Sequence, residues 1–380
     1  MDRMQWIAQH EDEIINTYKH LHTIPELGHK EFKTSAFIAE ELRRSGLEVE
    51  EKAEGTTGVI GILRGTEPGP VVGLRADMDA LPLTEETGLP FASTHPGVMH
   101  ACGHDAHCTI VLWTAKVLAA TGGIKRGVLK FVFQPAEEIL SGARRRLQSG
   151  KVDDIEDFYS LHLRPRSEAN FGEAAAGIAH SGSHQLKVTL RGKSSHGARP
   201  HQGINVAEIA GLISHAVRLV HCDPRVTHSA KCTGIKVDTG TINIIPDKGT
   251  MYFDLRSQTN EVMNDQIAKV TRAITKCAEA MGAEVEIESP GNCPAAQLDP
   301  ELVREASEAI TAVLGSSLGI VEVPASDDFH AFAVEGGKRT TLIGIGTDCE
   351  THHNPKVVYN LGATPIGVKI MTTLLSNKLG

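Results

Sequence analysis

Histidine, cysteine and aspartate side chains are concentrated in residues 100–107, which read HACGHDAH. Thiolate and neutral imidazole are good ligands for borderline-soft divalent cations, and Cys102 and His104 flank a glycine that permits a tight turn. A buried core readily contains one histidine or one cysteine, but rarely several such groups beside an aspartate. The segment therefore predicts a metal site rather than an ordinary polar turn.

A second cluster of reactive side chains is Gln134–Glu138, which follows an apolar run at 128–133. In α/β domains, ligand sites collect where strands end. Of two adjacent carboxylates, one can bind a metal while the other accepts a proton from water. Acidic residues are equally common near a helix N-terminus, where the helix dipole favours them. Taken alone, the segment is compatible with both interpretations.

Three further histidines are candidate ligands, although each is weak evidence alone. His162 ends a predicted strand, where a lone histidine is more often a hydrogen-bonding residue than a metal ligand. His352 and His353 precede Asn354-Pro355 in a predicted loop, and the proline restrains the backbone so that one imidazole can turn inward. Because all of them are distant from His104 in the sequence, only a folded sheet can bring them together.

The elements that must position these residues follow from hydrophobic periodicity. We expect an amphipathic helix that carries apolar residues from Met4 to Leu21. Further helices are predicted at 32–45, 106–120, 141–148, 300–314 and 365–374, and strands at 58–63, 70–74, 127–133, 158–163 and 340–345. This alternation predicts an α/β domain with a central sheet and helices on its faces.

The segment 183–290 has a different order of elements. It predicts strands at 185–190, 233–245, 250–256 and 283–288, with helices at 205–220 and 262–281. The order β-α-β-β-α-β is that of a ferredoxin-like α+β domain. We therefore expect a catalytic domain formed by residues 1–182 and 291–380, interrupted by an inserted domain at 183–290.

Length and composition narrow the function classes. A chain of 380 residues exceeds one ordinary core, and its net charge of −9 argues against a nucleic-acid partner. No apolar stretch has the roughly 18 residues of a membrane helix, and the first residues lack the basic-then-apolar order of a signal peptide. The seven cysteines lack paired spacing, as expected for free thiols. We expect a cytoplasmic protein that acts on a small molecule.

Four motifs together resemble a known family. They are ADMDALP at 76–82, MHACGHD at 99–105, FQPAEE at 133–138 and His353-Asn354-Pro355. The chain resembles the aminoacylase and carboxypeptidase family of two-metal peptidases. It is most similar to the amidohydrolase branch, which contains N-acyl-amino-acid aminoacylases, hippurate hydrolases and auxin-conjugate hydrolases. The resemblance runs in order from residue 21 to the last predicted helix.

The resemblance implies two divalent metal ions, zinc or manganese, with cobalt or nickel also compatible. Glu137 matches the general base, and Asp105 would steady a ligand imidazole, whereas Asp77 and Asp79 would shape the site. His353 rather than His352 precedes Asn-Pro and is the expected ligand. The full ligand set that the resemblance implies is Cys102, His104, Glu138, His162 and His353.

The resemblance also implies roles for the inserted domain. His196 matches a histidine that donates to the oxyanion, and Asn243 matches a substrate-contacting asparagine. Arg256 would grip a substrate carboxylate, although its neighbours Phe253–Ser257 lack the usual Gly-Thr. The inserted domain is expected to act as a lid over the metals and to form a homodimer through an edge strand.

The expected activity is hydrolysis of the amide bond of an N-acyl or N-aryl-acyl amino acid through a metal-bound hydroxide, with Glu137 as base. Two other reactions on the same metal centre stay open. One is dipeptide or carboxypeptidase cleavage, and the other is hydrolysis of a different C–N bond in an aromatic amine or carbamoyl compound. An inactive small-molecule binder would be marked by a missing ligand or base, whereas this sequence fills all six positions.

Overall fold

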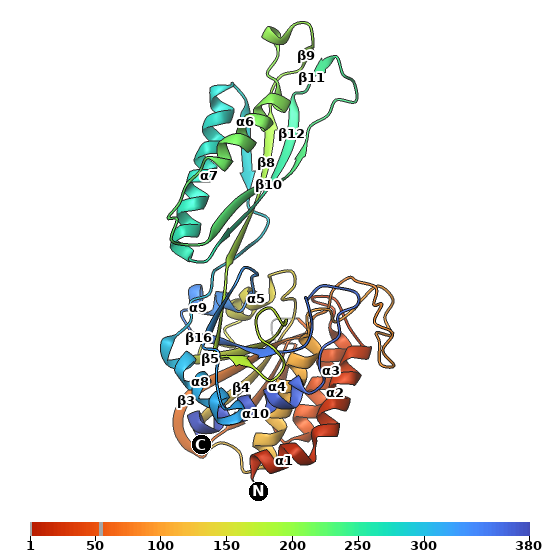
Figure 1. Cartoon of the computed structure of the whole chain (residues 1–380), viewed down its shortest axis with the longest axis vertical. Coiled ribbons are helices and arrows are strands. Elements are labelled where there is room, and N and C mark those ends of the chain that lie inside the picture. The colour runs from red at the N-terminus through yellow and green to blue at the C-terminus, as the bar shows by residue number, and fades with distance from the viewer. Residues whose placement is uncertain (1, 53–55) are drawn as a thin grey trace. The chain divides into compact units, whose positions relative to one another are not determined.

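The computed structural model describes residues 2–52 and 56–380, and the chain divides into two compact units (Figure 1). The first unit comprises the chain up to Ala179 together with Gln297–Val323 and Asp327–Gly380. The second comprises His180–Ala296 and Pro324–Ser326. Among the described residues, no helix has both the length and the apolar character needed to span a bilayer.

A mixed sheet forms the centre of the first unit. Its strands β3, β4, β5 and β16 run parallel, so their carboxyl ends meet at one edge. The shorter strands β1, β2 and β6 add antiparallel pairs at the margins. The sheet order is β1 (Glu48–Glu51), β2 (Val59–Arg64), β4 (Arg126–Gln134), β3 (Glu67–Asp77), β5 (Asp157–Arg164), β16 (Arg339–Gly346) and β6 (Ala174–Ala175).

Helices cover both faces of this sheet, because successive side chains of a strand point to opposite sides. Phe131 and Phe133 of β4 belong to one apolar core, whereas Val132 between them belongs to the other. The first core is lined by α1 (Arg3–Gln9), α2 (Glu11–Thr23), α3 (Phe32–Arg44), α4 (His104–Ala120), α8 (Pro300–Leu314) and α10 (Ala363–Leu379). The second is lined by α5 (Gly142–Gln148) and α9 (His330–Val334). The predicted α/β class is confirmed.

The second unit has the β-α-β-β-α-β order. Its sheet runs β10-β12-β8-β13, all in antiparallel pairs, and α6 and α7 share an apolar core with it. The elements in chain order are β8 (Gly182–Arg191), α6 (Val206–Arg218), β10 (His228–Lys236), β12 (Lys248–Ser257), α7 (Asn260–Ala280) and β13 (Glu284–Glu288). Short strands complete the two units: β7 (Gly177–His180), β9 (Ser195–His196), β11 (Ile244–Ile245), β14 (Asn292–Cys293) and β15 (Ile320–Val323).

Two predicted elements are wrong in their extent. The opening helix is broken at His10, whose ring stacks on Trp6 and whose Nδ1 lies 2.8 Å from the Trp6 carbonyl. The strand predicted at 233–245 ends at Lys236. Beyond it the chain turns at Gly240, which has φ +76° and donates its N–H to the Asp238 carboxylate. A local side-chain hydrogen bond and a left-handed glycine thus end the strand despite the apolar residues that follow.

A buried polar contact links α2 to the start of α4. His22 Nδ1 lies 2.6 Å from Asp105 Oδ2, and His22 Nε2 lies 3.3 Å from Glu85 Oε1. The other Asp105 oxygen accepts the Ala106 N–H at 2.9 Å. The expectation that Asp105 steadies a candidate ligand imidazole is therefore wrong. Its carboxylate holds His22 instead, because α2 packs directly against this end of α4.

Contact with two carboxylates makes the His22 interaction dependent on pH. Burial lowers the pKa of His22, but hydrogen bonds to Asp105 and Glu85 outweigh it and raise the pKa to about 10. Because the pKa of His22 in the folded protein lies above its usual value, this stabilisation is complete below about pH 6.5 and disappears as the pH rises through about 10.

Urea unfolding of metal-free wild type and of His22→Gln should show a difference in the free energy of unfolding that shrinks between these two pH values. A constant difference would contradict a charged His22.

Candidate metal centre

The metal-ligand candidates of the first unit come from the carboxyl edge of its parallel strands. His162 lies near the end of β5, and Glu137-Glu138 follow β4 after two residues. His353 lies in the loop after β16, and Cys102 lies just before α4, which begins at His104. Because the connection from β3 through α4 leads to a parallel strand, β4 ends at the same edge of the sheet as β3.

Gly103 sets the direction of the two donors beside it. Its φ is +95°, and a Cβ there would lie 3.2 Å from the Leu163 side chain. Only glycine adopts this backbone without strain. The turn lets Cys102 and His104 project into one space although they are two positions apart.

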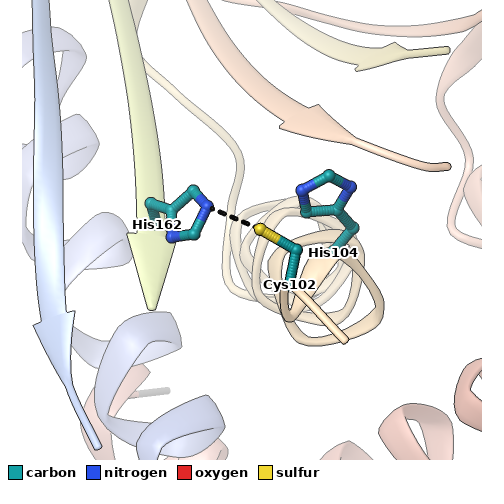
Figure 2. Close-up of side chains that lie close together, drawn as sticks. All are labelled: Cys102, His104 and His162. Atoms are coloured by element: carbon teal, nitrogen blue, oxygen red, sulfur yellow. Dashed lines mark hydrogen bonds between the residues drawn. The ribbon is translucent and has the colours of Figure 1, made fainter. Parts of the chain in front are cut away.

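Cys102, His104 and His162 form the centre of the cluster, and the thiol lies between the two imidazoles in Figure 2. Cys102 Sγ is 3.4 Å from His162 Nε2. His162 Nδ1 lies 2.6 Å from the Leu163 carbonyl, and His104 Nδ1 lies 2.8 Å from the Asp79 carbonyl. Because a carbonyl only accepts, both Nδ1 atoms carry a proton, so that in the neutral rings both Nε2 atoms present a lone pair.

Glu138 and His353 extend this cluster. Glu138 Oε1 lies 3.4 Å from His353 Nε2 and 3.9 Å from His104 Nε2. Within the described parts of the chain, the buried atoms His104 Nε2 and Glu138 Oε1 have no hydrogen-bond partner. Cys102, Glu138 and His353 also offer ligand atoms within 4.8 Å of one another. A cluster of sulfur, nitrogen and oxygen ligand atoms, two of them buried without a hydrogen-bond partner, is a fitting environment for divalent cations.

Two neighbouring histidines have other contacts. His107 Nδ1 donates to Asp77 Oδ1 at 2.6 Å, and its Nε2 accepts the Leu163 N–H at 2.8 Å. With both nitrogens engaged, His107 fixes the end of β5 and is no ligand candidate. His352 Nδ1 lies 2.8 Å from the Tyr359 hydroxyl, which donates to the Ala101 carbonyl. This contact directs the His352 ring toward Tyr359.

Asp79 shapes the turn that carries the two glutamates. Its Oδ1 accepts the Glu137 N–H at 2.9 Å, and its Oδ2 accepts the Glu138 N–H at 3.1 Å. Its carbonyl also orients His104, as described above. These contacts agree with the prediction that Asp79 shapes the site. Asp77 has a comparable role, because its carboxylate accepts hydrogen bonds from His107 and Arg75.

Acidic side chains dominate the electrostatics around Glu137. Buried Arg75 donates to Asp77 at 2.6 Å and to Asp328 at 3.0 Å. Glu137 Oε1 accepts the Asp328 N–H at 3.3 Å. Burial, followed by repulsion from Asp327, Glu138 and Asp328, raises the pKa of Glu137 well above its usual value. Bound divalent cations would offset this excess negative charge and favour the ionised carboxylate.

The sequence motifs did not indicate that Arg75 and Asp328 belong to the surroundings of Glu137. Arg75 lies in an apolar strand two positions before Asp77, and the pair Asp327-Asp328 follows the short strand β15 closely. Asp327-Asp328 is a pair of adjacent acids after a strand, like Glu137-Glu138, and this similarity was the one sign in the sequence that the pair belongs to the site. Their pairing with Arg75 depends on a contact across 253 residues, which local patterns do not reveal.

The remaining candidates lie in the second unit. His196 in β9 pairs with Ile244 in β11, and the exposed Asn243 precedes this pair. The Gly197 N–H donates to the Asn243 carbonyl at 2.7 Å, so the two candidates are neighbours. Arg256 lies near the far end of β12, where its Nε is 3.1 Å from both Asp254 oxygens and its Nη1 donates to Ser326 Oγ at 3.1 Å.

Comparisons with known proteins agree with this geometry. An N-acetylcysteine deacetylase of Bacillus subtilis (strain 168) is 30% identical over 342 residues, which cover 90% of each chain. Thermostable carboxypeptidase 1 of Saccharolobus solfataricus is 33% identical over 335 residues, covering 86% of this chain and 84% of the relative. A solved Bacillus subtilis structure, a dinuclear metal binding peptidase from the M20 family, superposes with a TM-score of 0.85 at 28% identity. That match covers 98% of this chain and 99% of the other.

The family description that matches is peptidase family M20/M25/M40, and it spans residues 73–377. This range includes the end of β3, all of α4, β4, β5 and β16, the loops that carry the candidate metal centre, and the whole second unit. Sequence, fold and donor cluster therefore agree that the chain belongs to peptidase family M20/M25/M40.

Proposed function

We propose that this protein is a metal-dependent hydrolase that cleaves the amide bond of an N-acyl amino acid. One observation carries the proposal: a thiol, imidazoles and a carboxylate gather beside the buried acid Glu137, and two of their ligand atoms, His104 Nε2 and Glu138 Oε1, have no hydrogen-bond partner among the described residues. The deacetylase relative acts on an N-acetyl amino acid, which matches the expected substrate class. The small-molecule substrate and the amidohydrolase class follow from the family.

Five side chains are proposed to hold two divalent metal ions. They fall into two overlapping groups that share Cys102, one with His104 and His162 and the other with Glu138 and His353. The mixed sulfur, nitrogen and oxygen set is compatible with zinc or manganese, and also with cobalt or nickel. When bound, such ions supply Lewis acidity that favours ionisation of water near neutral pH and polarises a carbonyl.

Glu137 is proposed as the general base. The Glu137 carboxylate is buried, and its Oε1 accepts a hydrogen bond from the Asp328 N–H. The backbone N–H of Glu137 donates to the Asp79 carboxylate. A carboxylate restrained in this way can accept a proton from water at its other oxygen and later deliver it to the departing amine. The same restraint keeps the acid oriented while its charge changes.

The second unit is proposed to supply substrate contacts and to close over the metals as a lid. His196 would donate to the developing oxyanion, and the neighbouring Asn243 would bind the substrate backbone. Arg256 would bind a substrate carboxylate. Its guanidinium already contacts Asp254 through Nε and Ser326 through Nη1, so a substrate carboxylate would share this group with both side chains.

Carboxypeptidase activity is the second candidate. A relative of that name is 33% identical over most of the chain. The same metals and base would serve a peptide bond equally well, since an N-acyl amino acid and a C-terminal residue both present a carbonyl next to an amino acid. The nature of the group on the acyl side distinguishes the two substrates.

An activity panel tests the function together with its base. Metal-loaded protein should hydrolyse N-acyl amino acids faster than dipeptides, longer peptides or arylamides. Glu137→Gln should retain fold and metal but reduce kcat by several orders of magnitude, because the proton acceptor is lost. Preference for peptides would favour the carboxypeptidase. A Glu137→Gln rate above about a tenth of wild type would remove Glu137 from its role.

The adjacent histidines provide a matched pair for testing the ligand set. His353→Ala should lower the metal content and the activity, because the His353 Nε2 approaches Glu138. His352→Ala should retain the metal, since its ring is bonded to Tyr359. Elemental analysis after dialysis measures both variants against wild type. Loss of metal in His352→Ala with retention in His353→Ala would show that the ligand assignment is wrong by one position.

We further propose that the protein is a homodimer that pairs through β10, an edge strand of the second unit. The other edge, β13, carries the exposed Glu284, Glu286 and Glu288, whose charges oppose strand pairing. β10 instead exposes Ile235, which is 47% accessible.

Light scattering should give twice the mass of one chain for wild type and the mass of a single chain for Ile235→Lys, because the lysine places a charge at the proposed interface. The control Ile320→Lys, at an exposed site of the first unit, should stay dimeric. A monomeric wild type would refute the pairing.

A further inference from the structure

Three consecutive backbone N–H groups of the turn that carries the two glutamates donate to carboxylates from elsewhere in the chain. Asp79 accepts from Glu137 and Glu138, as described above. The third N–H, that of Ala136, donates to Glu31 Oε1 at 3.0 Å. Glu31 comes from the segment that precedes α3, and its side chain is fully buried.

The turn needs support from outside because its own backbone is unfavourable. Ala136 has φ +57°, in the left-handed region that is strained for a residue with a Cβ. Its carbonyl accepts the Gly142 N–H at 3.1 Å, which closes the turn at its other end. Without a partner for the Ala136 N–H, a buried donor would also be left unsatisfied.

Glu31 is itself fixed on several sides. Oε1 also accepts the His29 N–H at 3.0 Å, and Oε2 accepts the hydroxyl of Thr57. The His29 ring lies 2.9 Å from Ser141 Oγ, directly beyond the turn. Gly28 packs so closely that a Cβ there would lie 3.2 Å from Ala136 Cα. The segment around Glu31 thus lies against the turn and cannot shift independently of it.

We propose that Glu31 is a positioning residue that holds the Ala136–Glu138 turn in the geometry required for catalysis. This inference rests on the proposed function of Glu137 and Glu138. Glu31 acts through hydrogen-bond acceptance at Oε1 rather than through its charge. Burial raises the pKa of Glu31 to about 7, although the Thr57 hydrogen bond lowers it. A protonated Oε2 can donate to Thr57 and leave Oε1 available to Ala136, so both charge states keep the turn in place.

The proposal is tested by substitutions that change either the length and acceptor atom of the Glu31 side chain or its charge. Glu31→Gln keeps an acceptor for Ala136 and gains an N–H for Thr57, so its kcat should stay close to wild type. Glu31→Ala removes the acceptor, and Glu31→Asp keeps the charge but is one methylene shorter. Both should lower kcat by up to about 100-fold with little change in KM, because small misplacements of catalytic groups have effects of that size. Metal content should be measured for every variant, so that kcat is compared at equal occupancy.

Asp299→Ala is the control for general destabilisation. Asp299 also accepts two backbone N–H groups, those of Glu301 and Leu302, at the start of α8. This variant should lose stability without a change in kcat. If Glu31→Ala does not fold, the comparison of Glu31→Asp with Glu31→Gln still decides between reach and charge.

Hydrogen exchange measures the same contact without any assay of activity. In metal-free protein, amides of residues 134–141 should exchange faster in Glu31→Ala and Glu31→Asp than in wild type, Glu31→Gln or Asp299→Ala. The proposal would be overturned if Glu31→Ala had unchanged hydrogen exchange or the kcat of wild type. It would also be overturned if Glu31→Gln and Glu31→Asp lost kcat equally. If wild type hydrolyses no N-acyl amino acid, the proposed function fails, whereas the exchange data still answer whether Glu31 holds the turn.

Discussion

Burial of carboxylate charge is the constraint on which the catalytic unit depends. Asp77, Asp327 and Asp328 surround the guanidinium of Arg75, and Glu137 lies beside them. A single buried cation cannot neutralise this group, and desolvation makes each uncompensated charge costly. The fold reduces that cost through backbone N–H donors, such as the amide of Asp328 for Glu137. Two atoms that have no hydrogen-bond partner among the described residues, His104 Nε2 and Glu138 Oε1, are among those that we propose for metal. If the proposed metal centre is correct, stability and chemistry are coupled here, because buried negative charges that oppose folding would also favour the binding of cations.

The sequence was sufficient for the class of fold and for the order of elements in the second unit. Long periodic segments such as α7 and clear strands such as β4 carry their own signals. Extents were less certain, as the break at His10 and the end of β10 at Lys236 show. The break at His10 and the end of β10 are set by side-chain hydrogen bonds or by one glycine. Hydrophobic periodicity, which is judged over many residues, does not detect such single contacts. The short strands of the second unit, such as β9 and β11, are too brief to give a periodic pattern.

For the candidate site, sequence motifs named residues but not their surroundings. Cys102, His104 and Glu138 stand out by type. The sequence does not reveal the groups that orient the site, such as the Asp79 carbonyl for His104 and the Leu163 carbonyl for His162. Asp105 was assigned to the wrong imidazole because helix packing decides which histidine it meets. Buried polar residues in apolar strands, such as Arg75, have no periodic signature. Their role follows only from contacts that span most of the chain.

The points where the chain enters and leaves the second unit are adjacent. The Ala296 N–H donates to the His180 carbonyl at 3.0 Å, and β14 pairs with the start of β8. A segment whose ends meet in this way can be gained, lost or exchanged without stretching the sheet that hosts it. The host unit could thus keep its donor cluster while the guest diverged in sequence. Substrate preference and assembly could then change over evolution while the hydrolytic chemistry stayed the same.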